Sequence, residues 1–517
     1  MSIDLLKEYI KLNKLILETE SQSVFESDII VPDIKPDISE LLLVDADTAV
    51  DSVENFRDKI NVNFTVNYKI LYRSKTGETP VTPINCSTKF SSSINADSLD
   101  TDANLNVNCD VEHIDFSLLN DRKINTKCIV KFTINAACIK EIGLASGISG
   151  NDSAQVKNQD CQISSCIDSI HEKCSISETI SIPGVKSSIL EILRTDTALL
   201  GKSSKIIDGN LIVKGELAVT VMYIAADEAK SIQYMENTLP FSCSTEVFTT
   251  DTVNLETSVC LDYFRLTAVE DSDGEMRCLE ADAEICVNAA FYENQTVSIL
   301  DDAYCLDSSL NLSRENIRTS SFIGDVSNQF VLKELIKKSE YAPDMLEIIN
   351  VSCKCGAPES RVENGRILLE SFVKCTFLYL SNDNCPVASF STEIPYKYVF
   401  DKKDIPENAS LSIKADVEHI NFSLVSSDEA EVRIVICAFA NITTINDISV
   451  ISKISETEIS DDSRMSRPSV TIYYVKPDDS IWSVAKNYST TCDIIKAFND
   501  LDDKGTLTTG MKLVIPK

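Results

Sequence analysis

The fold is decided by a stretch that occurs twice: residues 110–118 read Asp-Val-Glu-His-Ile-Asp-Phe-Ser-Leu, and residues 416–424 read Asp-Val-Glu-His-Ile-Asn-Phe-Ser-Leu. Eight of the nine positions match. A weaker copy, Ser-Val-Cys-Leu-Asp-Tyr-Phe-Arg-Leu, occupies residues 258–266. A repeat at this spacing indicates several copies of one structural module, so the search for domains begins here.

Two further anchors support three copies. Each copy has a tyrosine that ends a strand-like run: Tyr72, Tyr223 and Tyr379. Each copy also has a Glu-Leu or Leu-Glu pair near its start, around Glu40, Glu191 and Glu334, where we expect a short helix. If Glu334 is the third anchor, copy three holds about 13 extra residues before its tyrosine.

Inside the copies the apolar residues alternate. The run Ile60, Val62, Phe64 and Val66 is an example. Alternation of this kind marks a strand with one face on a core, and a lone sheet needs a second layer to cover that face. The sequence therefore predicts a mainly β protein with three repeated, sandwich-like modules, at residues 26–145, 175–305 and 320–445.

The segments outside the modules have different sequence patterns. Residues 1–25 carry a helical stripe of apolar side chains, which predicts an N-terminal helix that packs on the first module or binds a partner. Residues 146–174 and the Ser- and acid-rich residues 446–468 are expected to be linkers.

The last segment, residues 469–517, predicts a small domain in the order βααβ. Apolar residues at helical spacing follow a short alternating strand. Asp478 or Asp479 is expected to cap the first helix, and Thr490 with Asp493 the second.

Composition and charge narrow the function. The 517 residues include 48 Lys and Arg and 80 Asp and Glu, a formal net charge of −32. Such a chain repels phosphate backbones, so we expect no nucleic-acid partner. Since no run of 18 apolar residues occurs, we expect no membrane span. The N-terminus lacks the apolar region of a secretory signal, so we expect the protein to stay in the compartment where it is made.

The 18 cysteines are then expected to be mostly reduced, buried thiols. One group, Cys161, Cys166, His171 and Cys174, offers ligand types that zinc accepts. Its spacing fits no standard zinc motif, so we expect no metal there, and zinc stays an alternative. For Cys353 and Cys355 we likewise expect no metal, and zinc stays an alternative.

The search for an active site is negative. The sequence contains no phosphate-binding glycine loop, nucleophile elbow or HExxH motif. His113 and His419 occupy the same repeat position, where the middle copy has Leu261, so we expect a structural role for both. The sequence predicts no enzyme, no catalytic residue and no cofactor.

The tail resembles a LysM domain, from Tyr474 through the Pro-Asp-Asp-Ser-Ile-Trp run to the closing Leu-Val-Ile-Pro strand. LysM domains typically bind glycans that contain N-acetylglucosamine, such as peptidoglycan. The family's Gly-Asp-Thr-Leu turn is Asp478-Asp479-Ser480-Ile481 here, and the change from Gly to Asp adds charge beside the usual sugar groove.

The modules resemble the SPOCS (DUF3794) domain through residues 28–38, Asp-Ile-Ile-Val-Pro-Asp-Ile-Lys-Pro-Asp-Ile. Three such domains before a LysM domain resemble the SipL-like family of clostridial spore-coat morphogenetic proteins. The resemblance implies a non-catalytic adaptor in the mother-cell cytoplasm, at the forespore surface and in the spore coat. Its implied partners are a SpoIVA-like coat-basement ATPase and other coat proteins. The alternative is an anchor that binds cortex or wall peptidoglycan.

Trp482 and Lys486 complete the predicted site. Trp482, the only tryptophan, points away from the core stripe of its helix, and Lys486 lies one turn further on the same face. We expect both to contact the partner of the LysM domain, together with the altered turn at Asp478, Asp479 and Ser480. Packing at the rim of the domain is the alternative for Trp482, and full solvation for Lys486.

Overall fold

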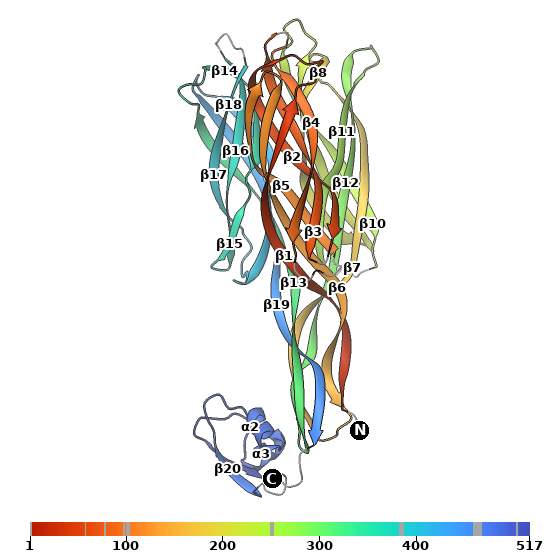
Figure 1. The fold of residues 1–517 in the computed structure, drawn as a ribbon, viewed down its shortest axis with the longest axis vertical. Coiled ribbons are helices and arrows are strands. Elements are labelled where there is room, and N and C mark those ends of the chain that lie inside the picture. The colour runs from red at the N-terminus through yellow and green to blue at the C-terminus, as the bar shows by residue number, and fades with distance from the viewer. Residues whose placement is uncertain are drawn as a thin grey trace.

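The computed structural model describes residues 3–56, 58–76, 79–96, 99, 104–248, 253–381, 387–458, 468–502 and 505–516. Strands dominate it, and the two helices among these residues both lie near the C-terminus. Three β modules form one end of the molecule, a narrower shaft of strands follows, and the small C-terminal domain lies at the far end of the shaft (Figure 1).

The first module is a sandwich of two antiparallel sheets. One layer holds β1 (Asp4–Ile30), β6 (Lys123–Ser149) and β5 (Asn104–Asn120), which are part of a nine-stranded sheet shared by all three modules. The other holds β2 (Ile38–Asn55), β3 (Lys59–Ser74) and β4 (Thr82–Asn95). The predicted alternation is confirmed, because Ile60, Val62, Phe64 and Val66 are all buried in the core between the sheets.

The second and third modules repeat this plan. In the second, β7 (Ala154–Ser181), β12 (Met276–Cys305) and β11 (Asn254–Glu270) face β8 (Ile189–Ile207), β9 (Asn210–Ala225) and β10 (Ile232–Glu246). In the third, β13 (Ser308–Lys337), β19 (Glu429–Glu458) and β18 (Ala409–Leu424) face β14 (Met345–Cys355), β15 (Glu359–Glu363), β16 (Arg366–Ser381) and β17 (Val387–Val399). The prediction of three sandwich-like modules is therefore confirmed.

The repeated tyrosines perform the same task in each module. Each is fully buried, and its hydroxyl donates to a backbone carbonyl 36 residues earlier. The pairs are Tyr72 with Pro36 (2.8 Å), Tyr223 with Ser187 (3.2 Å) and Tyr379 with Pro343 (3.1 Å). The bond ties the segment that enters the first strand of the sheet to the end of its central strand.

The Glu-Leu anchor was wrong in two respects. Glu40 and Glu191 lie in strands, not in a short helix. Glu334 lies in β13, whereas the residue that occupies the position of Glu40 is Glu347, which pairs with Leu380 as Glu40 pairs with Arg73. Because Glu347 and Tyr379 have the same spacing as Glu40 and Tyr72, copy three holds no insertion there.

Six long strands run on beyond the modules and form the shaft: β1, β6, β7, β12, β13 and β19. Their apolar side chains meet in a common core made of Ile10, Leu144, Ile163, Val297, Ile299, Ile317 and Val450. The predicted helix within residues 1–25 is wrong, because β1 pairs with β6 along its whole length, from Asp4 opposite Ser149 to Ile30 opposite Lys123. A partner strand from far along the chain overrides the local helical spacing.

Both expected linkers also need correction. Residues 146–174 comprise the end of β6, a turn and most of β7. Residues 446–458 are the end of β19, where Val450 and Ile451 face inward between polar neighbours. Residues 459–467 lie outside the described part of the chain. In the described part of these two segments, polar residues such as Asp160, Ser455 and Glu456 lie on the solvent side of shaft strands.

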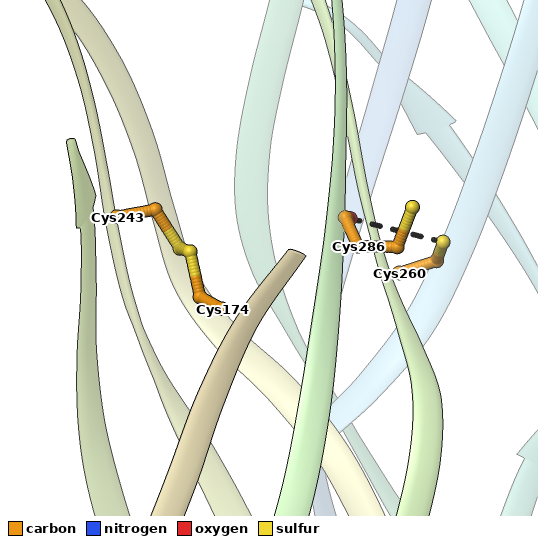
Figure 2. Close-up of a disulfide and its surroundings, with 4 residues drawn as sticks. All are labelled: Cys174, Cys243, Cys260 and Cys286. Atoms are coloured by element: carbon orange, nitrogen blue, oxygen red, sulfur yellow. Dashed lines mark hydrogen bonds between the residues drawn. A yellow bond between two sulfur atoms is a disulfide. The ribbon is translucent and has the colours of Figure 1, made fainter. Parts of the chain in front are cut away.

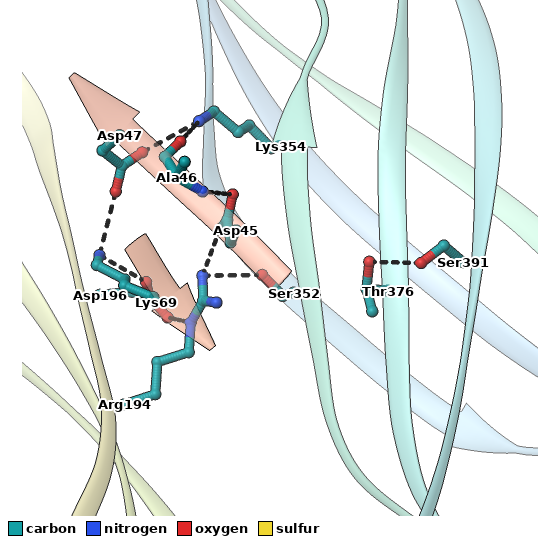
Figure 3. Close-up of polar contacts among 10 residues, drawn as sticks. All are labelled: Asp45, Ala46, Asp47, Lys69, Arg194, Asp196, Ser352, Lys354, Thr376 and Ser391. Atoms are coloured by element: carbon teal, nitrogen blue, oxygen red, sulfur yellow. Dashed lines mark hydrogen bonds and ion pairs between the residues drawn. The ribbon is translucent and has the colours of Figure 1, made fainter. Parts of the chain in front are cut away.

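The three modules meet around a small apolar core and a charged cluster. The apolar core draws on all three modules: Leu42, Leu43, Leu71, Val81, Leu193, Met222, Ile224, Leu378 and Val387. Beside it, the guanidinium of Arg194 donates to Asp196 and Asp45, at 2.8 Å for the latter (Figure 3). Lys69 and Lys354 bridge further carboxylates of the same cluster, so its charges are paired across module boundaries.

The C-terminal domain has the predicted βααβ order: β20 (Val470–Tyr474), α2 (Ile481–Tyr488), α3 (Cys492–Phe498) and β21 (Lys512–Pro516). The helices cover one face of the two-stranded sheet. The helix caps differ from the prediction by one or two residues. Ser480 caps α2 in a capping box with Ser483, and Thr491 caps α3. Both caps are hydroxyl side chains in extended backbone, which accept from the first free amides of the helix.

Candidate partner-binding site on the C-terminal domain

The altered turn before α2 holds Asp478 in a left-handed conformation. The amide of Asp479 donates to the carbonyl of Lys476 at 3.3 Å, which closes a turn with Pro477 and Asp478 at its two central positions. Asp478 has φ 68°. A turn with proline first and positive φ second is type II, and its second position favours glycine. The aspartate therefore occupies the one place in the turn where the family's glycine has a conformational advantage.

Asp479 holds this turn together. Its Oδ2 accepts from the hydroxyl of Tyr473 at 2.6 Å and from the amide of Lys476 at 2.8 Å. The hydrogen bond from Tyr473 lowers the pKa of Asp479, and the same bond raises the pKa of Tyr473 to about 12. With Ser480 employed as the helix cap, Asp478 is the predicted turn residue whose exposed side chain has no role in this local structure.

Trp482 and Lys486 share one face of α2, and that face lies against the shaft. Trp482 Nε1 donates to Asp302 Oδ2 at 2.8 Å. Lys486 Nζ donates to the two oxygens of the same carboxylate, at 2.6 and 2.8 Å. The Trp482 ring also meets Tyr304 edge to face, with centroids 4.9 Å apart. The two residues predicted to contact a partner thus contact β12 of the same chain.

Asp302 and Tyr304 were missed by the sequence reasoning. Tyr304 is 5% exposed, lies in the core of the C-terminal domain and donates its hydroxyl to the carbonyl of Thr490 at 2.7 Å. Burial opposes ionisation of Asp302, but the hydrogen bonds from Lys486 and Trp482 outweigh it and lower the pKa of Asp302. Nothing in the local sequence marks this Asp-Ala-Tyr stretch, because its role depends on a domain some 180 residues away.

A second face of the C-terminal domain is apolar and open. Val470, Ile472 and Tyr474 point away from the helices, and each is more than half exposed. On the neighbouring strand Val514 pairs with Ile472 and continues this face. The domain therefore has one face against the shaft and another directed to solvent.

The opposite end of the molecule carries a repeated apolar feature. The long strands β1, β7 and β13 each end in a tight turn, and the third residue of each turn is a large apolar side chain in solvent. These residues, here called the apolar tips, are Ile34, Val185 and Tyr341, which are 92%, 96% and 97% exposed. Turns usually place polar residues or glycine at this position. Three modules repeat the same exception, so the tips are a second candidate contact surface.

The alternative zinc site does not form. Cys161, Cys166, His171 and Cys174 lie along the single strand β7, so their side chains are spread over its length. Cys174 is in a disulfide with Cys243 of β10, which takes one proposed ligand away (Figure 2). Fourteen other cysteines among the described residues are free thiols, so the expectation of mostly reduced cysteines stands, with this pair as the exception. His171 instead lies 2.6 Å from the side-chain oxygen of Asn288.

The other residues singled out also have structural surroundings. Cys353 lies 3.1 Å from Cys375 on the adjacent strand, sulfur to sulfur. His113 lies 2.9 Å from Asp115 and His419 3.7 Å from Glu236, and both imidazoles are about half exposed. At the end of the shaft, Cys305, Asp307 and Glu456 lie close together, and Asn151 donates to Glu456 at 2.9 Å. This cluster of one thiol and two carboxylates was not predicted from the sequence.

A cavity of about 1720 Å³, lined by both polar and apolar side chains, lies between the modules. Glu256 is part of its lining and accepts from Tyr292 and from Asn441, both at 3.2 Å. Burial raises the pKa of Glu256. The residues that line the cavity come from all three modules, as they do in the charged cluster of Arg194.

In the part of the chain that the structure describes, no helix is long and apolar enough to cross a membrane.

Comparison with protein-family models gives two matches. The model described as "SipL, SPOCS domain" matches three segments, residues 37–119, 188–264 and 344–425. Each segment falls inside one of the three modules. The model of the LysM domain matches residues 473–516, the C-terminal domain. No curated protein and no solved structure gave a match.

Proposed function

We propose that this chain, which has the SipL-like architecture of three SPOCS domains followed by a LysM domain, is a non-catalytic adaptor in spore-coat assembly. In this proposal its LysM domain binds a SpoIVA-like coat-basement ATPase, and the chain promotes encasement of the forespore from the mother-cell cytoplasm. The domains make it a sporulation-related protein that carries a LysM domain, and both domain families are non-catalytic.

The observation that carries the proposal is the chemistry of the α2 face. An indole N–H and a lysine ammonium converge on one carboxylate, and a tyrosine ring meets the edge of the indole. Tryptophan and tyrosine are enriched at interfaces between proteins, and charge-assisted hydrogen bonds to a carboxylate are stronger than neutral ones. The residues of this face therefore favour a protein partner.

The length of the molecule also supports an adaptor. The LysM domain lies at the end of the shaft where β1 begins, and the apolar tips follow the other ends of β1, β7 and β13. A strand of 27 residues such as β1 spans about 90 Å. Two contact surfaces at opposite ends suit a protein that joins two layers, and we propose that the tips contact other coat proteins.

The LysM contact can be tested with full-length protein and polymerised coat-basement ATPase in a sedimentation assay. We expect Trp482→Glu and Lys486→Glu to reduce co-sedimentation, because both replace a donor with a carboxylate. Lys512→Glu is the matched control, since Lys512 is exposed and lies opposite Tyr474 on the sheet face that points away from the helices. Equal binding by all variants would contradict a contact through the α2 face. Absence of binding by the wild type would contradict the ATPase as the partner.

The contact at the tips has its own test. Replacement of Ile34, Val185 and Tyr341 together by Asp should leave binding to the ATPase unchanged, because the LysM domain lies at the other end. The same variant should fail to recruit coat proteins to the forespore in sporulating cells. Normal coat localisation with this variant would show that the tips are not the second contact.

Peptidoglycan binding remains a second candidate, because LysM is a peptidoglycan-binding family. The turn at Asp478 adjoins α2, and its φ of 68° is compatible with the glycine of the family pattern. A pelleting assay with insoluble peptidoglycan separates the two candidates. Pelleting by the wild-type chain without binding to the ATPase would make this protein a cortex or wall anchor.

A further inference from the structure

We infer that the α2 face of the LysM domain is a recognition site for an extended strand with a carboxylate followed two residues later by an aromatic ring. The chain's own Asp302 and Tyr304 fill this site in the structure, so a protein partner must present the same chemistry and displace them. Only the identity of that partner rests on the proposed function, because the site itself is defined by contacts within this chain.

The carboxylate half of the site is fully used. Both oxygens of Asp302 accept from Lys486, and one also accepts from the indole of Trp482. The side chain of Asp302 is only 19% exposed. Hydrogen bonds between an ammonium and a carboxylate are roughly twice as strong as neutral ones, and partial burial strengthens them further.

The aromatic half lies two residues further along the same strand. Tyr304 packs against Trp482 and inserts into the core of the domain, where Leu306 joins it. Alternate residues of a strand share one face, so Asp302 and Tyr304 both point to the LysM domain, and Leu306, just past the end of β12, also packs against its core. Ala303, between them, packs in the core of the shaft. The site thus contacts two alternate positions at the end of one strand, Asp302 and Tyr304, and the apolar residue that follows the strand.

The neighbouring aspartate shows that position, not charge alone, decides the contact. Asp301 is one residue earlier and faces the shaft, where Lys157 lies 2.8 Å away and Arg314 3.9 Å away. Two adjacent aspartates of equal charge therefore have different partners. Asp301 is for this reason the matched control for Asp302.

Covalent connection favours the internal occupant. Residues 459–469 join the last shaft strand to the LysM domain, and a short tether gives a local concentration on the order of millimolar. A site of modest intrinsic affinity is then filled by its own chain. An external strand must bind more tightly or arrive in many copies, as on a polymer surface.

The first test uses the fluorescence of Trp482, which is the only tryptophan. In the full-length Asp302→Ala variant we expect a red-shifted emission and an acrylamide quenching constant that rises about twofold, because local opening exposes the indole. Asp301→Ala should match the wild type. If Asp302→Ala also matches the wild type, the internal occupant does not depend on its carboxylate and the inference is wrong.

The second test supplies the strand in trans. The probe is a synthetic peptide of residues 299–307 with serine in place of Cys305, added to a full-length Asp302→Ala, Tyr304→Ala chain. It should restore the protection of Trp482, and a peptide with Asn in place of Asp302 should bind about tenfold more weakly, as loss of one charged hydrogen bond predicts.

Equal binding of the two peptides, or no binding of either, would overturn the inference. Neither readout includes the ATPase. Failure of the adaptor proposal would therefore leave both results intact, and failure of these tests would not touch sedimentation with the ATPase.

Discussion

At the scale of single residues, Asp478 is the position where local strain can be measured. An L-residue in the left-handed region costs about 1–2 kcal/mol, less for aspartate than for most side chains. We therefore expect Asp478→Gly to stabilise the LysM domain by about 0.5–1 kcal/mol. Urea unfolding followed by Trp482 fluorescence reports on this domain and on its contact with the shaft, because no other tryptophan contributes.

The control for this substitution is Asn487→Gly. Asn487 is exposed within α2, where the backbone is helical and glycine is unfavourable. Asn487→Gly should therefore lower the free energy of unfolding of the LysM domain, whereas Asp478→Gly should raise it. A loss of stability in both variants would mean that the side chain of Asp478 contributes more than its backbone conformation costs.

At the scale of elements, Ile163 distinguishes a strand from a linker. It is 2% exposed in the shaft core, and its neighbour Gln162 faces solvent. Loss of a buried isoleucine costs about 2–5 kcal/mol, whereas an exposed change costs little. We expect Ile163→Ala to lower the free energy of unfolding by that amount and Gln162→Ala to have a small effect, in chemical denaturation of the full chain. Similarly small losses of stability in both variants would mean that this segment is a linker and not a strand of the shaft core.

The disulfide between β7 and β10 is a second prediction at this scale. Cys174 and Cys243 are 69 residues apart, and a loop of that size gives about 4 kcal/mol in the chain-entropy description. Reduction by dithiothreitol, or Cys243→Ser, should therefore destabilise the second module by up to about 4 kcal/mol. Cys86→Ser serves as a control in the first module. Mass spectrometry of the alkylated protein shows whether the bond is present, and two free thiols in protein purified under oxidising conditions would contradict it.

At the scale of the whole molecule, Arg194 couples the modules. Its side chain is 5% exposed and pairs with Asp45 of the first module and Asp196 of its own. Removal of one partner from a buried ion pair costs about 3–5 kcal/mol, because a charge is left uncompensated. Arg194→Ala should therefore destabilise the packed modules by that amount in urea. Arg361→Ala, at an exposed ion pair, should change stability by no more than about 1 kcal/mol.

The same cluster predicts a dependence on pH. Burial would raise the pKa of Asp196, but Arg194 and Lys69 lower it below 3.8 overall. A lowered pKa in the folded state gives stability that is complete above the ordinary pKa and is lost as the pH falls through the lowered value. The wild-type chain should thus keep this contribution at neutral pH and lose it only in strong acid. Arg194→Ala should show a smaller loss between pH 5 and pH 2, measured by denaturation at each pH.

The sequence by itself determined the features that depend on near neighbours. The three copies followed from Phe116, Phe264 and Phe422 in a repeated stretch, and the sandwich followed from alternation such as Ile60 to Val66. In the LysM domain, the shared face of Trp482 and Lys486 followed from helical spacing alone. Each of these patterns lies within about ten residues, where the backbone period fixes which side chains point together.

Only the tertiary structure decided the features that depend on distant partners. The N-terminal residues form a strand because β6, more than a hundred residues later, offers a complete set of hydrogen bonds. Residues 154–174, within the expected linker, form a strand for the same reason, with β12 as the partner. The occupant of the Trp482 face, Asp302, belongs to another domain. Hydrogen bonds and ion pairs between segments far apart in sequence leave no local signal, so local apolar spacing suggested a helix and local composition suggested a linker.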